Sequence, residues 1–349
     1  MLGVLWFKVV VGGYVFRRVA EAEIETSWRT LGDTAKIQLP NLKALLDARA
    51  EGGGIKGGQK VEIWIGYLNE DLRGKAPKDI DQRLTEKGTM HLEFEGFVRR
   101  IEPNVPLVLE CEDYLYQFKR TAIDRAWKNT TLLGIARDLV AEVNRQTKSG
   151  ITLDEKQVPD SKIEKWRCAR VNAAEALDKL KEAYGLFAYL RGKQLYLGLA
   201  YLDEKEKRRR AVRYEYGKNI IETDLTYRRK EDVRLQVNAI GILPDNKKIE
   251  VKLGDGEGER RDLVFYDIRD KATLTKLAQN TLNSQKMDGY EGGFTTFGLP
   301  FAQHSDVADY ADPRYADRDG RLVIDRVTVS AGSGGFRRKI KLGLQLPTK

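Results

Sequence analysis

The spacing of hydrophobic residues changes twice along this chain of 349 residues, and that change constrains the fold more than any other feature. Apolar and polar residues alternate up to about residue 117, as they do in half-buried strands. Apolar residues then recur every three or four positions, as in amphipathic helices, and alternation returns near residue 213. The pattern predicts a mainly β protein with an α+β insertion, divided into domains at residues 1–117, 118–212 and 213–349.

The first region has the short, evenly spaced strands of a barrel or sandwich. Gly96 interrupts the longest apolar run, where we expect a bulge or bend. We expect one short helix at Leu42–Arg49, and surface loops at Gly52–Gly58 and Asn69–Gly88, which are rich in glycine and in charge. The expected strands are Val4–Val11, Ala22–Trp28, Ala35–Leu39, Val61–Tyr67, Leu92–Ile101 and Leu107–Cys111.

The middle region predicts two helices and a hairpin. The first helix covers residues 131–147, and its apolar residues follow helical spacing from Leu132 to Val143. The second begins at Asn172, where Asn172 and Glu175 form a variant of the capping box, and runs to residue 184. Two short apolar runs then flank Arg191-Gly192-Lys193, which is the spacing of a tight hairpin.

The last region returns to strands, with one more helix near residues 272–287. Leu235–Ile242 and Ile249–Leu253 flank a turn and are expected to pair as a hairpin. The strands Leu263–Ile268, Phe294–Leu299, Leu322–Val329 and Phe336–Leu344 complete the region.

Composition excludes several kinds of site. The chain has two cysteines, Cys111 and Cys168, which lack the spacing of a zinc site and are expected to be core thiols. It also has two histidines, His91 and His304, neither beside a nucleophile or metal motif, and both are interpreted as incidental polar residues. We therefore expect no catalytic, metal or cofactor site. No apolar run approaches the ~20 residues that span a bilayer, and no secretory signal is recognised, so synthesis in a cytoplasm is expected.

Four segments carry a family resemblance. Gly57–Tyr67 is similar to the G-x-x-V-x-I-x-x-G strand, and Phe94–Glu102 to the F-x-G-x-I-x-x-I segment, of the baseplate hub proteins of contractile phage tails. Gly320–Val327 and Gly335–Leu344 are similar to the closing strands of the same proteins. The chain thus resembles the late control D family, which is related to the hub part of type VI secretion spikes.

The resemblance implies two tube-like antiparallel β-barrel domains flanking the α+β domain. It also implies a homotrimer whose barrels form a pseudo-hexameric ring, joining a hexameric tail tube to a trimeric spike or tip. Other baseplate proteins would be further partners, DNA would pass transiently through the lumen, and the location would be the virion tail tip. Since no lysozyme or spike domain follows the second barrel, a structural role without enzymatic activity is expected.

The basic C-terminal strand holds the candidate site residues. Because side chains alternate across a strand, Arg337, Lys339 and Lys341 should lie on its outer face. Arg338 should fall on the inner face with Ile340, Leu342 and Leu344. We interpret the outer cations as a subunit contact, with lining of the DNA channel as the alternative.

Two other functions remain open from the residues. The net charge of +9, with Trp127–Lys128 and Tyr227–Lys230, allows a nucleic-acid-binding β-barrel of the OB type. A carboxylate-based hydrolase would use the acidic segment that contains Asp306, Asp309, Asp312, Asp317 and Asp319. The simpler interpretation of that segment is a solvated loop.

Overall fold

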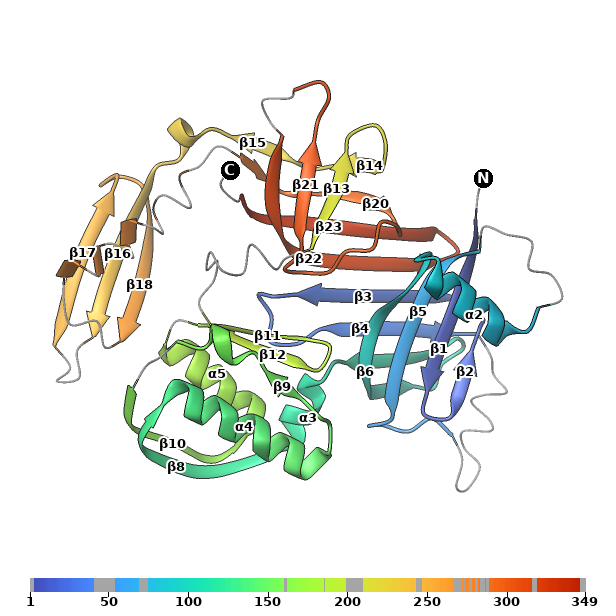
Figure 1. Ribbon diagram of the computed structural model, residues 1–349, viewed down its shortest axis with the longest axis horizontal. Coiled ribbons are helices and arrows are strands. Elements are labelled where there is room, and N and C mark those ends of the chain that lie inside the picture. The colour runs from blue at the N-terminus through green and yellow to red at the C-terminus, as the bar shows by residue number, and fades with distance from the viewer. Residues whose placement is uncertain are drawn as a thin grey trace.

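The computed structural model describes residues 3–40, 54–68, 75–159, 162–184, 186–198, 210–242, 247–266, 289–315 and 319–345, with scattered positions between 271 and 286. The expected helix at Leu42–Arg49 lies outside these residues. The described chain is mainly β (Figure 1).

The described residues of the first region form seven strands and two helices. They are β1 (Val4–Val11), β2 (Tyr14–Phe16), β3 (Glu21–Ser27), β4 (Thr34–Leu39), β5 (Lys60–Leu68), α2 (Pro77–Glu86), β6 (Met90–Glu102), β7 (Leu107–Glu112) and α3 (Leu115–Arg120).

The middle region alternates strands with helices. Its elements are β8 (Ala122–Thr131), α4 (Leu132–Thr147), β9 (Thr152–Leu153), the 3-10 turn Glu155–Gln157, β10 (Lys162–Asn172), α5 (Ala173–Ala183), β11 (Phe187–Arg191) and β12 (Gln194–Gly198).

The last region is again built of strands. They are β13 (Ala211–Glu215), β14 (Ile220–Thr223), β15 (Thr226–Arg228), β16 (Leu235–Ile242), β17 (Lys248–Gly254), β18 (Glu259–Tyr266), β19 (Gly289–Glu291), β20 (Gly293–Phe297), β21 (Val307–Ala311), β22 (Gly320–Gly332) and β23 (Gly335–Gln345). A 3-10 turn, Lys230–Asp232, precedes β16.

One 13-stranded sheet joins the first and last β-rich regions. Its main path runs β14-β20-β23-β22-β3-β4-β7-β6-β5-β1-β2, and β21 pairs with β22 and β13. The two regions meet where β22 pairs antiparallel with β3, with Val329 opposite Ile24. The sequence predicted the strands but not this junction, because the two pairing segments are some 300 residues apart in the chain.

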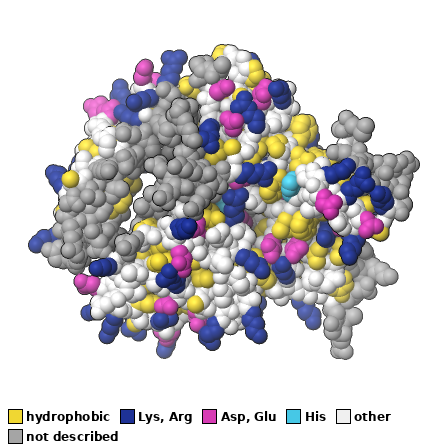
Figure 2. All heavy atoms as spheres, in the orientation of Figure 1, with side chains coloured by type: hydrophobic (Ala, Val, Ile, Leu, Met, Phe, Trp, Pro, Cys, Tyr) yellow, Lys and Arg dark blue, Asp and Glu magenta, His cyan; other side chains and the backbone are white. Residues whose placement is uncertain are grey.

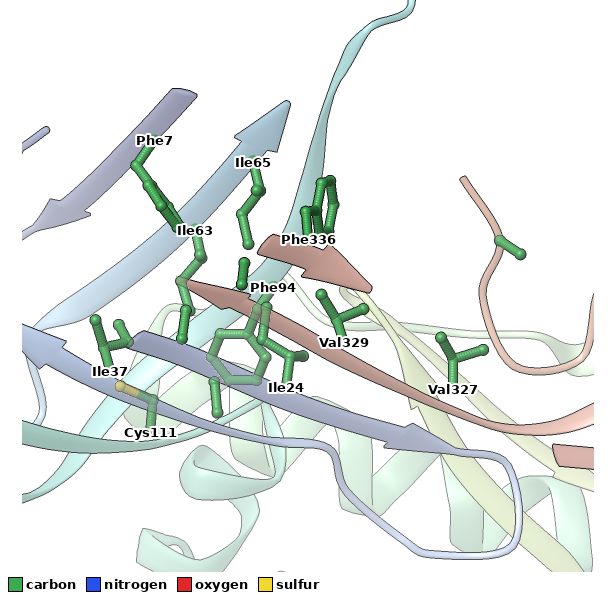
Figure 3. Packing of buried hydrophobic residues seen from close by; sticks show 14 of the residues in the cluster. Phe7, Ile24, Ile37, Ile63, Ile65, Phe94, Cys111, Val327, Val329 and Phe336 are labelled. Atoms are coloured by element: carbon green, nitrogen blue, oxygen red, sulfur yellow. The ribbon is translucent and has the colours of Figure 1, made fainter. Parts of the chain in front are cut away.

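A single hydrophobic core lies inside this sheet. It contains Phe7 and Ile63 from the first region together with Val329 and Phe336 from the last, and all four are nearly inaccessible to solvent. Figure 3 shows these side chains converging from β1, β5, β22 and β23. Burial of so much apolar surface from both regions stabilises them as one body. Cys111 belongs to this core, as expected, and burial raises the pKa of its thiol to about 12.

The middle region has its own core, built largely as predicted. In α4 the buried residues are Leu132, Ile135, Ala136, Leu139, Val140 and Val143. Thr131 caps α4 by accepting a hydrogen bond from the Gly134 N–H, and Asn172 and Glu175 complete the capping box of α5. Cys168 is buried here without a disulfide. The two helices lie between the β8–β10 ribbon and the β11–β12 hairpin (Figure 1).

A third small core lies under β16–β18. Pairing of β16 with β17 confirms the predicted hairpin, while β18 adds to β16 in parallel. The segment expected as a helix near 272–287 is helical at residues 271, 272, 274, 275, 278, 279 and 282. Leu274, Ala278 and Leu282 are the buried residues among these, and they pack against Val237 and Val251.

Two local predictions in the first region were wrong. The expected loop Asn69–Gly88 contains α2, which begins with Pro77 and buries Ile80 and Leu84 against Met90. The bulges of β6 lie at Glu93 and Arg99, where the pairing registers shift, and not at Gly96. Gly96 instead allows a close approach, since a Cβ there would lie 2.3 Å from the carbonyl oxygen of Glu112.

Candidate assembly surface

The β22–β23 hairpin presents the candidate site residues. Lys339 and Lys341 are exposed and Arg337 is half-buried, while Phe336, Arg338 and Ile340 between them are buried. The guanidinium of Arg337 lies 5.1 Å from the ring centre of Phe297, which keeps part of its surface covered. The Leu344 side chain lies outside those described. All three candidate cations therefore project from one side of β23, across from the core.

The same face of the sheet carries an acidic strand, β3, which lies one strand away from the basic strand β23. On β3, Glu21, Glu23 and Glu25 are exposed while Ala22 and Ile24 point into the core. β22 separates the two strands and contributes Arg326, which lies 3.2 Å from Glu25. Sequence analysis did not single out these glutamates, although their alternation with Ala22 and Ile24 was the available signal. The outward face thus carries basic residues on β23 and acidic residues on β3, with β22 between them.

Lys339 and Lys341 have no carboxylate partner among the residues described, in contrast to Arg326. Lys339 stands opposite Thr295 and Thr328, and Lys341 stands opposite Gly293 and Arg326. Neutral or like-charged neighbours leave these two charges without a counter-charge among the described residues. They are therefore available to an acidic partner.

Arg338 lies on the inner side of β23 and makes a buried network. Its Nη2 donates to Oε1 of Glu93 at 2.7 Å, and its guanidinium also donates to the carbonyl oxygens of Gly298 and Ala302. Burial raises the pKa of Glu93, and the charge of Arg338 opposes that shift. Because Glu93 belongs to β6, this ion pair ties the last region to the first behind the outward cations.

The acidic segment 306–319 is not the solvated loop that was predicted. Asp306 is fully buried and accepts a hydrogen bond from Arg191 of the middle region at 2.8 Å. Asp312 is buried too and pairs with Arg314 at 2.8 Å. Asp309 lies in β21 and pairs with Arg213, and Asp317 lies outside the described residues. Asp306, Asp309 and Asp312 are thus each engaged in an ion pair, and Asp319 accepts a hydrogen bond from the Asp312 N–H.

The two histidines also lie in structured surroundings. His304 was interpreted as an incidental polar residue, but it is buried, 3.5 Å from Asp33 and edge-on to Tyr189. His91 stacks on Phe301 with ring centres 4.6 Å apart, and burial lowers its pKa.

In the part of the chain that the structure describes, no group of three or more histidine, cysteine, aspartate or glutamate side chains could hold a metal ion. No described helix is long and apolar enough to cross a membrane.

The aromatic residues that suggested nucleic-acid binding contact other side chains of the protein. Trp127 is buried and its indole N–H donates to Asp138 at 2.7 Å. Tyr227 contacts Tyr290 edge-on at 5.2 Å. Stacking of single-stranded bases requires exposed aromatic faces. Neither residue provides the platform that this function would need.

Solved structures of phage tail proteins share the whole architecture. A tail protein from Neisseria meningitidis matches with a TM-score of 0.64 and 15% identity, over 98% of this chain and 96% of that one. The 43 kDa tail protein of prophage MuSo2 from Shewanella oneidensis matches with a TM-score of 0.59 and 13% identity, over 97% of each chain. This chain has the fold of phage tail proteins. The predicted mainly β architecture with an α+β insertion is confirmed.

A secretion-system protein has the same fold. A type VI secretion component of E. coli, described as similar to T4 bacteriophage tail proteins, matches with a TM-score of 0.55 and 10% identity. The match covers 98% of this chain and 77% of that one. No family model and no curated protein matches by sequence. The predicted resemblance to tail hub and spike proteins is thus confirmed by the structural matches, at sequence identities of 10% to 15%.

Proposed function

We propose that this protein is the structural hub of a phage or phage-like tail tip or baseplate. In this role it forms a trimeric, pseudo-hexameric ring that joins the hexameric tail tube to a trimeric spike or tip. The observation that carries the proposal is the full-length structural match to phage tail proteins from two bacteria. Fold similarity does not by itself assign function, so the proposal depends on the assembly experiment below.

The arrangement of strands supports a pseudo-hexamer. The main path of the sheet runs through four strands of the last region, β14-β20-β23-β22, and then through seven of the first region, β3-β4-β7-β6-β5-β1-β2. A trimer of such chains would present six β-rich regions, two from each chain, which suits a six-fold tube on one side and a three-fold spike on the other. Cyclic assembly requires heterologous contacts that close on themselves. We therefore propose residues 1–117 and 213–349 as the two ring domains, with 118–212 as a separate α+β domain.

The proposed partners follow from this placement. They are two further copies of the chain, the tail tube protein, a spike or tip protein and other baseplate proteins, with DNA in transient contact inside the ring. The proposed location is the tail tip of the virion, after synthesis in the host cytoplasm. A purely structural role without enzymatic activity agrees with the tail proteins that share the fold.

Within the ring, we propose that Arg337, Lys339 and Lys341 contact an acidic surface of the neighbouring subunit, with the DNA channel as the alternative. Charged groups at a contact set orientation and association rate, and each exposed pair contributes only ~0–1 kcal/mol. A single substitution should therefore have a mild effect. Reversal of all three charges on β23 should have a larger, combined effect on assembly.

The test is charge reversal of the whole row. Arg337→Glu, Lys339→Glu and Lys341→Glu together should leave the monomer folded but reduce the yield of complete tails at least tenfold. Reversal of Arg137, Arg145 and Lys181 on α4 and α5 changes the net charge equally and should leave tail yield unchanged. If the row variant builds infectious tails at normal yield, the outward cations of β23 have no role in assembly.

A further inference from the structure

The β8–β10 ribbon carries a second basic surface, far from β23 along the chain. The two strands pair antiparallel, with Trp127 opposite Trp166 and Lys128 opposite Lys165. The tryptophans face the helices of the middle region, where Trp127 is buried and Trp166 packs against the core. Since neighbouring residues on a strand point to opposite sides, Lys128, Lys165 and Arg167 lie on the outward face, and all three are exposed.

This face holds positive charges that the chain does not neutralise. Lys128, Lys165 and Arg167 make no ion pair with any residue that the structure describes. Like charges directly opposite each other on paired strands are destabilising. Lys128 and Lys165 stand in such opposite positions. Figure 2 shows Lys and Arg side chains along the lower rim, where Figure 1 places β8 and β10.

Several other cations of the middle region form ion pairs with carboxylates. On the helices, Arg137 pairs with Glu155 at 2.6 Å, Arg145 with Glu142 at 2.5 Å, and Lys181 with Asp178 at 2.8 Å. Arg125, on the helix-facing side of β8, pairs with Asp138 at 2.8 Å. The ribbon differs, because three cations without an ion pair among the described residues, Lys128, Lys165 and Arg167, lie together on its outward face.

The ribbon also has free edges. Its sheet contains two strands, so the outer edge of each has no strand neighbour among the described residues. An extended segment of a partner can add to such an edge through backbone hydrogen bonds, while its side chains select for complementary charge. We infer that the outward face of the β8–β10 ribbon is a docking surface for an extended acidic segment of a partner protein.

Two features favour a protein segment over nucleic acid. The exposed carboxylate of Asp124 lies on the same face of β8 as Lys128 and would repel phosphate groups. The aromatic rings of the ribbon face the core, which removes base stacking as a source of affinity. The inference does not rest on the proposed hub function, since the surface lies in the middle region and is tested on the isolated chain.

The test uses a short fluorescein-labelled peptide of alternating glutamate and threonine, with fluorescence anisotropy measured on the full chain at low salt. The ribbon variant Lys128→Gln, Lys165→Gln and Arg167→Gln should bind the peptide on the order of tenfold more weakly than the unmodified chain. The control variant Arg137→Gln, Arg145→Gln and Lys181→Gln loses the same charge from the same region, and should bind within about twofold of the unmodified chain. Circular dichroism checks that both variants are folded.

Each other outcome overturns the inference. Equal losses in the two variants would show that net charge alone attracts the peptide. If the unmodified chain does not bind the peptide, the outward face of the ribbon is not a docking surface for an acidic segment. Tighter binding of duplex DNA than of the peptide, lost in the ribbon variant, would assign the face to nucleic acid instead.

Discussion

The guanidinium of Arg338 on β23 and the carboxylate of Glu93 on β6 form a buried ion pair with a distance of 2.7 Å between Nη2 and Oε1. The side chains are 1% and 2% exposed, so neither charge has access to bulk water. The pair joins strands that lie 245 residues apart and belong to the two β-rich regions. The ion pair therefore connects the first and last β-rich regions inside the fold.

Removal of one member of this pair should be strongly destabilising. Glu93→Ala leaves the Arg338 cation buried without a counter-charge, which costs about 3–5 kcal/mol of the free energy of unfolding. Urea denaturation measures the change. The double variant Glu93→Leu and Arg338→Met should recover much of the loss, because a buried pair replaced by apolar groups is often nearly neutral. A loss below about 1 kcal/mol in Glu93→Ala would contradict the structural role given to the pair.

Reversal of one charge on the β8–β10 ribbon should stabilise the isolated chain. Lys165→Glu replaces the opposed Lys128 and Lys165 with an attractive pair, which contributes roughly 0.2–1 kcal/mol. Thermal unfolding of the variant should show a higher Tm at low salt, and a smaller gain at high salt. Lys181→Glu, which breaks the pair with Asp178, is the matched control and should not raise the Tm. An unchanged or lower Tm in Lys165→Glu would mean that the two lysines do not repel each other.

The pH dependence of stability should include a contribution from Asp113. Burial raises the pKa of this carboxyl well above its usual range, and the nearby Asp33 carboxylate raises it further. Between the ordinary and the raised pKa the folded state binds more protons than the unfolded state, so stability falls as pH rises through that window. Asp113→Asn removes the titration and keeps an oxygen to accept from the Leu115 N–H.

The measurement is urea unfolding of both proteins at several pH values from about 4 to 8. Relative to the unmodified chain, Asp113→Asn should become more stable as pH increases. If the difference between the two proteins is constant over the range, Asp113 does not titrate in the folded state at the raised pKa.

Local sequence patterns predicted the helices of the middle region almost residue by residue. The buried residues of α4 match the apolar spacing, and Asn172 and Glu175 form the expected cap, because both features involve neighbours within one or two helical turns. α2 was missed because its apolar face is short. The available signal was Pro77 at the first turn followed by Ile80 and Leu84 on one face.

Contacts between distant segments could not be predicted in the same way. Alternation places Arg338 on the inner face of β23, but nothing in the sequence identifies Glu93 as its partner. The acidic segment that begins at Asp306 has the composition of a solvated loop. Asp306 is buried because it pairs with Arg191, which is distant in the sequence and lies close only in the tertiary structure. The candidate assembly surface was predicted in part. Alternation places the cations on the outer face of β23, but it does not predict that the acidic strand β3 lies on the other side of β22.

The most direct test of the proposed hub function is cryo-electron microscopy of tail particles isolated from cells that express a tagged form of this chain. The account predicts three copies at the end of the tail tube, with the first and last β-rich regions alternating around the tube axis in a pseudo-six-fold ring. Two copies at the tube end, or tail particles that lack the tagged chain altogether, would contradict the proposed role.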